Sequence, residues 1–195
     1  RMVARMVYVR HTAAGWKVLE ELCLEPKSFT LATMHRPHNV DNAEGLKDIT
    51  DILRRSAARL PVVLPMHPRT RNNLEKHGLL EDVLAIDNLH ILEPQGYLQF
   101  LQLMDNARLI VTDSGGIQEE TTYLQVPCLT FRDTTERPIT VELGTNILMA
   151  DLDPDTVMVE VDNILEGRAK TGVVPPLWDG HAAERIRDIL LKELG

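Results

Sequence analysis

The sequence predicts an α/β fold in which a parallel β-sheet carries helices on both faces. Short apolar runs of strand length alternate with segments whose apolar residues recur at helical spacing, and neither a repeat nor a low-complexity run interrupts them. The 195 residues are 44% hydrophobic, which is enough for the core of one large domain or of two small ones. Only 4% are aromatic, so we expect an aliphatic core.

In the first half of the chain the pattern predicts strands and helices in alternation, with one irregular segment after the strand at 29–33. Residues 6–9 fit a strand or a crossing segment, and residues 13–24 fit a helix that Pro26 ends. Strands are predicted at 29–33, 62–64 and 89–92, and helices at 46–60 and 71–77. Residues 34–42 between the first strand and its helix are so rich in turn-forming residues that we expect no regular structure there.

The second half continues the alternation. Strands are predicted at 109–111, 127–131 and 146–149, and helices at 97–104, 117–124 and 154–165, with a short helix that ends near Leu143. Residues 171–177 form an irregular link that contains prolines, and residues 180–194 form a final amphipathic helix.

The segment 112–120 joins a strand directly to a helix through Ser114, Gly115 and Gly116. Ser114 is a favourable helix cap, and the two glycines let a ligand approach the backbone closely. The free N–H groups and the dipole of the following helix would then attract a phosphate group. The alternative is a tight turn before a capped helix, with Glu119 and Glu120 placed to suit the dipole.

Polar side chains follow five of the predicted strands directly, at 35–36, 67–69, 95, 114–116 and 132–137. Because ligands bind beyond the carboxyl ends of the strands in such sheets, we expect these five loops to surround one binding site. His35 and Arg36 suit an anion, as does His67 beside the fixed cation Arg69. Arg69 could equally form a surface salt bridge, and Phe100 could belong to the core.

A metal site is not expected. His35 and His38 are separated by Pro37, so they do not share a helix face, and no cysteine or helical glutamate partner accompanies them. We expect His38 to be a solvated loop residue. Cys23 and Cys128 lie in apolar surroundings, which predicts small buried side chains in a reducing compartment.

The charge balance limits the class of partner. A net charge of −8 argues against non-specific nucleic-acid binding, so an anionic ligand would need a local site. We see no apolar run that could span a membrane and no signal peptide, and we therefore expect a cytoplasmic protein without a membrane partner. The chain begins at Arg1 as if it had been cut from a longer protein.

With these motifs assembled, the chain resembles the non-hydrolysing UDP-N-acetylglucosamine 2-epimerases over nearly its whole length. The strongest resemblance lies in 112–120, read as TDSGGIQEE, and in 132–138, read as RDTTERP. Further support comes from the segments at 35–36, 39–42, 66–69 and 178–180.

The resemblance implies a fold and a set of roles. The fold would be a single Rossmann-like nucleotide-sugar-binding domain over 1–195, the C-terminal domain of a GT-B pair, with a C-terminal helix in 178–195. By this resemblance, Ser114, Gly115 and Gly116 would bind the diphosphate of UDP, and Glu120 would accept hydrogen bonds from the ribose hydroxyls. Gln95 and Phe100 would lie around the uridine, and Arg137 would contact the nucleotide. His35 would lie at the diphosphate, beside the reacting sugar.

The implied reaction interconverts UDP-N-acetylglucosamine and UDP-N-acetylmannosamine by elimination and re-addition of UDP, without a cofactor. The acids that move the C2 proton would belong to an N-terminal domain that this chain lacks, so the chain alone is expected to be inactive. The full-length enzyme is expected to be a homodimer. Two alternatives are the UDP-sugar-binding half of a glycosyltransferase and a nucleotide-sugar sensor without catalysis.

Overall fold

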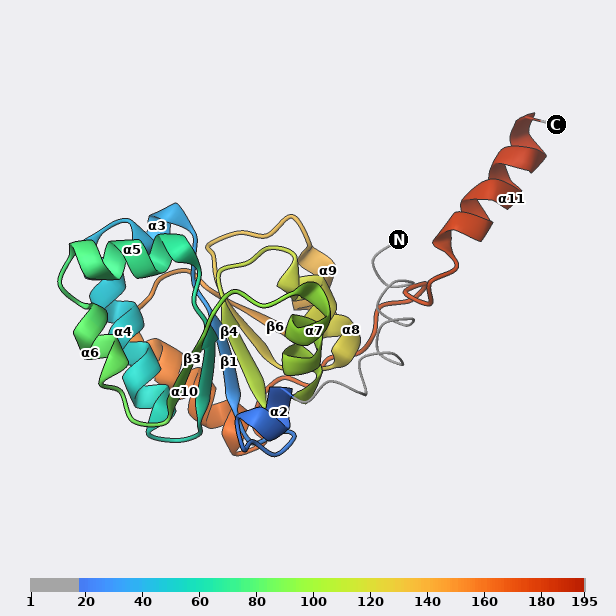
Figure 1. The fold of residues 1–195 in the computed structure, drawn as a ribbon. Coiled ribbons are helices and arrows are strands. Elements are labelled where there is room, and N and C mark those ends of the chain that lie inside the picture. The colour runs from blue at the N-terminus through green and yellow to red at the C-terminus, as the bar shows by residue number, and fades with distance from the viewer. Residues whose placement is uncertain (1–17, 195) are drawn as a thin grey trace.

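The computed structural model describes residues 18–194 as one sheet flanked by helices (Figure 1). The strand or crossing segment predicted at 6–9 lies outside the described residues, as does the first part of the helix predicted at 13–24. Of that helix the described part contains α2, Val18–Glu21. Within residues 18–194, no helix combines the length and apolar character needed to cross a membrane.

All pairings within the six-stranded sheet are parallel, as predicted. Its strands are β1 (Thr30–Thr33), β2 (Val62–Pro65), β3 (Leu89–Leu92), β4 (Leu109–Thr112), β5 (Cys128–Phe131) and β6 (Asn146–Met149). The strand order is β3-β2-β1-β4-β5-β6, the order of a Rossmann-type sheet. The direction of winding therefore reverses between β1 and β4.

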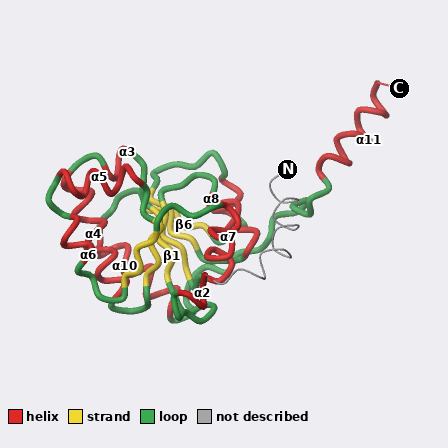
Figure 2. The backbone as a smooth tube through the Cα atoms, viewed as in Figure 1, coloured by secondary structure: helices red, strands yellow, loops and turns green. Residues whose placement is uncertain are grey.

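Helices cover both faces of the sheet (Figure 2). They are α3 (Pro37–Val40), α4 (Ala43–Ala57), α5 (Pro68–Lys76), α6 (Leu80–Leu84), α7 (Tyr97–Asn106), α8 (Ile117–Leu124), α9 (Pro138–Glu142), α10 (Pro154–Leu165) and α11 (Ala182–Leu194). One core lies between the sheet and α4, α5, α6 and α10, and a second lies between the sheet and α2, α7 and α8.

Successive strand residues supply the two cores in turn. Leu109 and Val111 belong to the core under α4 and α10, whereas Ile110 between them belongs to the core under α7 and α8. A strand that is buried on both faces is mostly apolar along its length, because its side chains alternate between the two cores. This explains the continuous apolar runs in the sequence.

Three helices in the first half of the chain differ from the prediction. The segment 34–42, predicted to be irregular, contains α3, because Pro37 at its first turn presets the helical φ angle. The helix predicted at 71–77 begins earlier, at Pro68, where the ring nitrogen Nδ1 of His67 accepts a hydrogen bond from the Arg69 N–H over 3.1 Å. Helix α6 was not predicted at all.

Ser114 does not cap α8. The helix begins at Ile117 after Gly116, and no side chain bonds to its first N–H groups. The backbone N–H of Ser114 instead donates to the Thr112 hydroxyl over 3.0 Å, which turns the chain before the helix starts. Cys128 is buried as predicted, but Cys23 is exposed, with a left-handed φ of 54°.

The last helix, α11, stands away from the sheet and its helices (Figure 1). None of its described residues is buried, and its apolar side chains from Ile186 to Leu194 are all exposed.

Candidate functional site

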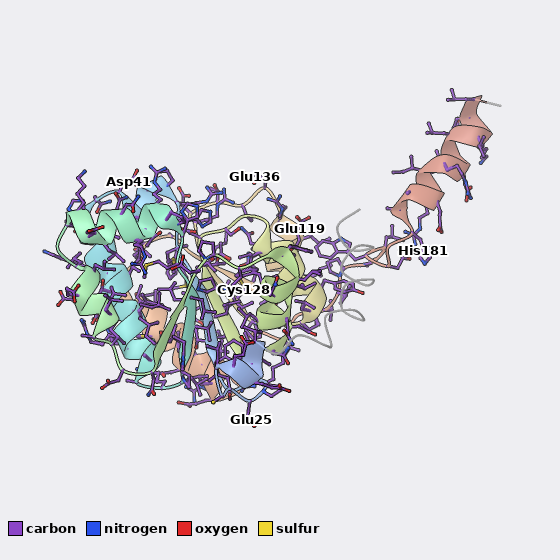
Figure 3. The ribbon with its side chains drawn as sticks, in the orientation of Figure 1. Glu25, Asp41, Glu119, Cys128, Glu136 and His181 are labelled. Carbon is purple, nitrogen blue, oxygen red and sulfur yellow. The ribbon has the colours of Figure 1, made fainter. Side chains whose placement is uncertain are left out.

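The site lies where β1 and β4 run side by side and their loops leave in opposite directions. At the carboxyl ends of these strands, the hydroxyls of Thr33 and Thr112 are hydrogen-bonded over 2.7 Å. A crevice forms at such a point because the helices that follow the two strands lie on opposite faces of the sheet. In Figure 3, Asp41 and Glu136 mark this edge, and Glu25 marks the opposite edge.

Asp113 ties the two loops together. Its fully buried carboxylate accepts hydrogen bonds at Oδ2 from the backbone N–H groups of His35 and Arg36, over 2.9 and 2.8 Å. The amide of Asn39 donates to the same oxygen over 3.3 Å. The carboxylate therefore fixes the backbone after β1 from a position just after β4.

The second oxygen of Asp113, Oδ1, lies 3.0 Å from Nδ1 of His35. No other donor among the described residues reaches this buried oxygen, so we infer that Nδ1 carries a hydrogen and donates it. The ring then presents Nε2 on its other side. Sequence reasoning missed Asp113 as a site residue because only the pairing of β1 with β4 brings it to His35.

The two ionisable groups shift each other's pKa in opposite directions. The hydrogen bond to Asp113 raises the pKa of His35, although burial of the ring opposes this. Burial raises the pKa of Asp113, but the hydrogen bonds from the His35 ring and from the backbone N–H groups outweigh it and hold that pKa below its usual value. His35 is thus biased toward its cationic form.

Three arginine side chains converge on Gly115. A methyl group built on Gly115 would lie 2.6 Å from Nη1 of Arg132, 3.5 Å from Nη1 of Arg137 and 3.7 Å from Nη2 of Arg36. Only a residue without a side chain leaves this space open. Nη1 of Arg132 is buried and has no hydrogen-bond partner among the described residues. Arg132 was not predicted individually, although its loop was.

The two glutamates of α8 point to different partners. Glu119 accepts a hydrogen bond from Nε of Arg137 over 2.6 Å, whereas Glu120 accepts from the Tyr97 hydroxyl over 3.3 Å. Burial raises the pKa of Glu120, and the negative charge of Glu119 adds to this, while the Tyr97 hydroxyl opposes it. The hydrogen bond that Arg137 donates to Glu119 raises the pKa of Arg137, so this guanidinium stays charged.

A cavity of about 200 Å³ opens beside His35. Four loops contribute the predicted site residues His35, His67, Gln95 and Ser114 to its lining, and α7 contributes Phe100. The remaining lining residues are Thr33, Met34, Pro65, Pro94 and Ile117. The rings of His35 and His67 are 5.5 Å apart between centroids. A second cavity of about 430 Å³, between the start of α4 and the loop after β5, is lined in part by Arg36 and Arg132.

Arg69 lies apart from this arrangement. Its guanidinium forms an ion pair with Asp41, with Nε 2.8 Å from Oδ1, and it lines neither cavity. His38 is exposed. Across the described part of the chain, no group of three or more His, Cys, Asp or Glu side chains is arranged to hold a metal ion.

Comparisons with known proteins identify the family of this chain. Residues 2–191 match the family model described as UDP-N-acetylglucosamine 2-epimerase. The UDP-N-acetylglucosamine 2-epimerase of Methanocaldococcus jannaschii is 42% identical over 164 residues, which are 83% of this chain and 44% of that protein. A Pseudomonas aeruginosa relative, UDP-2,3-diacetamido-2,3-dideoxy-D-glucuronate 2-epimerase, is 37% identical over 172 residues, or 84% of this chain and 44% of its own length.

Among solved structures, the M. jannaschii UDP-GlcNAc 2-epimerase in complex with UDP-GlcNAc and UDP superposes with a TM-score of 0.78 and 35% identity. The match covers 97% of this chain and 52% of that one. The chain therefore spans about half the length of the relatives it matches, and the predicted Rossmann-like fold of the GT-B type is confirmed. The match to the family model and the identity to its members together establish that this chain belongs to the UDP-N-acetylglucosamine 2-epimerase family.

Proposed function

We propose that this chain is the UDP-binding part of a UDP-N-acetylglucosamine 2-epimerase, which interconverts UDP-N-acetylglucosamine and UDP-N-acetylmannosamine by elimination and re-addition of UDP. The convergence of Arg36, Arg132 and Arg137 on the open space at Gly115 carries the proposal. Three fixed cations beside the start of a helix suit a diphosphate, which needs several donors at once. They also explain how a chain of net charge −8 attracts an anion.

The surrounding side chains suit the rest of the ligand. We assign the uridine to the cavity that Gln95 and Phe100 line, and the ribose hydroxyls to Glu120, one turn into α8. Ser114, Gly115 and Gly116 hold the diphosphate, with Arg36, Arg137 and His67 around it. The ion pair with Asp41 supports no ligand contact for Arg69, so its predicted role stays a prediction.

The chemistry explains why the cations matter. When the bond between the sugar carbon C1 and the diphosphate oxygen breaks, negative charge develops on UDP. Donors that are already in place stabilise this charge without reorganising during the reaction. His35 lies beside the diphosphate site with its pKa raised, so it is suited to donate from Nε2 to the departing oxygen. The same contacts keep UDP in place for re-addition to the sugar.

The chain alone is expected to bind UDP but not to epimerise UDP-N-acetylglucosamine. The residues described here stabilise the leaving group, and none of them is assigned to remove the C2 proton. Calorimetry with UDP and with uridine measures binding, and exchange of the C2 proton with solvent deuterium measures turnover. Sustained exchange catalysed by the pure chain would contradict the assignment, and absence of UDP binding would contradict the proposed function itself.

Replacement of Glu120 by alanine is expected to weaken UDP binding by about 1.5–3 kcal/mol, because a charge-assisted hydrogen bond to the ribose is lost. Binding of inorganic pyrophosphate should hardly change, since Glu120 lies one turn away from the diphosphate site. Titrations of both ligands provide the measurement, and Tyr97→Phe is the matched control because it removes the hydroxyl that contacts Glu120 while keeping the carboxylate. Equal losses for both ligands would show that Glu120 acts on the phosphate end or on the fold.

A further inference from the structure

A buried amide on α8 holds the loop that carries two of the three arginines. Gln118 is fully buried, and its Oε1 accepts a hydrogen bond from the Thr135 hydroxyl over 2.6 Å. Thr135 in turn accepts at its hydroxyl oxygen from the backbone N–H of Arg137, over 3.0 Å. The hydroxyl therefore uses its one hydrogen toward the helix and one lone pair toward the loop.

The same amide is anchored on its other side. Asn146, the first residue of β6, donates from Nδ2 to Oε1 of Gln118 over 3.1 Å, and its own Oδ1 accepts from the Thr130 hydroxyl of β5 over 2.6 Å. A continuous hydrogen-bonded chain thus connects β5, β6 and α8 to the loop after β5. Gln118, Asn146 and Thr130 are each fully buried, so this chain is shielded from water.

Burial of so many polar groups costs stability unless each is paired, and a side chain of similar size without polar atoms would avoid that cost. Nε2 of Gln118 has no partner among the described residues, so the core gains little from an amide here beyond its Oε1 contacts. The hydrogen bond at Oε1 holds Thr135, which lies between Arg132 and Arg137 in the sequence of the loop. The helix that begins at the diphosphate site therefore also holds the cations of that site.

We infer that Thr135 and Gln118 are positioning residues, which hold the loop 132–137 so that Arg132 and Arg137 face Gly115 before any ligand arrives. The inference rests on the proposed diphosphate site and adds two residues that line neither of its cavities. A preordered loop loses little conformational freedom on binding, so its arginines contribute more of their interaction to affinity.

The test compares Thr135→Val, which removes the hydroxyl at nearly constant shape, with Thr135→Ser, which keeps it. Titrations use UDP, inorganic pyrophosphate and uridine as ligands. We expect Thr135→Val to weaken UDP and pyrophosphate about three- to tenfold, as the loss of one or two hydrogen bonds implies, and to leave uridine unchanged. Thr135→Ser should restore both phosphate ligands.

Thr50→Val is the matched control, because Thr50 is a buried threonine whose hydroxyl donates within α4, to the Leu46 carbonyl oxygen over 2.7 Å. It should lower stability without changing the ratio of UDP to uridine affinity. If Thr135→Val also leaves that ratio unchanged, or weakens uridine equally, the positioning role is wrong.

Hydrogen exchange of the Arg137 amide provides a readout that needs no ligand. This N–H donates to Thr135, so Thr135→Val should accelerate its exchange several-fold relative to the amides of β5, and Thr135→Ser should not. Failure of the wild-type chain to bind UDP would overturn the proposed function alone. Unchanged exchange at Arg137 in Thr135→Val would overturn the positioning inference whatever the ligand result.

Discussion

Replacement of His35 by asparagine in the full-length enzyme is expected to lower turnover by about 10²–10³, the scale observed when one preorganised donor is removed from a developing negative charge. UDP affinity should change much less, because a donor to the departing oxygen is worth most in the transition state. Asparagine offers a shorter donor toward Asp113, but it lacks both the distal ring nitrogen and the positive charge.

The measurement follows exchange of the C2 proton for turnover and calorimetry for UDP affinity, in wild type and variant. His181→Asn is the matched control: the same substitution on an exposed histidine that lines neither cavity of the site should leave both quantities unchanged. A loss of UDP affinity large enough to account for the whole defect would show that His35 only binds. Unchanged turnover would show that His35 takes no part in the reaction.

The second large effect is expected at Asp113. Asp113→Asn places an amide where four donors meet a buried carboxylate, so at least one N–H loses its acceptor or faces another donor. We expect a loss of about 2–4 kcal/mol in the free energy of unfolding, in the range for breaking a buried charged hydrogen-bond network. Turnover should fall as well, because His35 loses the group that orients it and favours its charge. Urea denaturation and C2 proton exchange provide the two measurements.

The pH dependence of the free energy of unfolding should distinguish Asp113→Asn from wild type. The folded pKa of His35 is raised above 6.5, so its contribution to stability is complete below 6.5 and is lost as pH rises through the folded value. The folded pKa of Asp113 is lowered below 3.8, so its contribution is present above 3.8 and is lost as pH falls through the folded value. The pair therefore stabilises the fold most between these limits.

In wild type, the urea midpoint should fall as pH rises from 6.5 into the alkaline range, and Asp113→Asn should remove the part of this slope that His35 contributes. Binding of UDP-N-acetylglucosamine, whose diphosphate carries no proton that titrates near neutral pH, should weaken over the same range in wild type only. Parallel slopes in wild type and Asp113→Asn would show that the ion pair does not set the protonation of His35.

The sequence predicted the sheet well because strands covered by helices on both faces are rich in apolar residues. Runs such as 109–111 and 128–131 leave few alternatives to a buried strand, and the parallel arrangement places every following loop at one edge. Four of the five predicted loops contribute side chains to the cavity beside His35. Proximity of this kind follows from topology alone, so it can be predicted without knowing the order of the strands.

What the sequence could not predict depends on that order or on single torsion angles. Asp113 meets His35 across 78 residues of chain, and only the pairing of β1 with β4 makes them neighbours. The role of Arg132 depends on the position of its guanidinium beside Gly115, which the sequence of a polar loop does not specify. Serine is a favourable helix-capping residue, but the N–H of Ser114 donates to the Thr112 hydroxyl and the helix starts later. At α3, Pro37 acted as a helix initiator within a segment whose composition indicated a loop.

The central position of β1 has a consequence for how the chain folds. Its two neighbours form at very different times during synthesis, since β2 begins at Val62 whereas β4 begins at Leu109. Until β4 is synthesised, one edge of β1 has no partner strand. Pairing of β1 with β4 requires a contact between residues almost eighty positions apart. The contact between His35 and Asp113 connects the loops that follow these same two strands. A nascent chain that ends before β4 can therefore assemble β1, β2 and β3 with an open edge prone to aggregation, and the proposed diphosphate site is completed only when β4 pairs with β1.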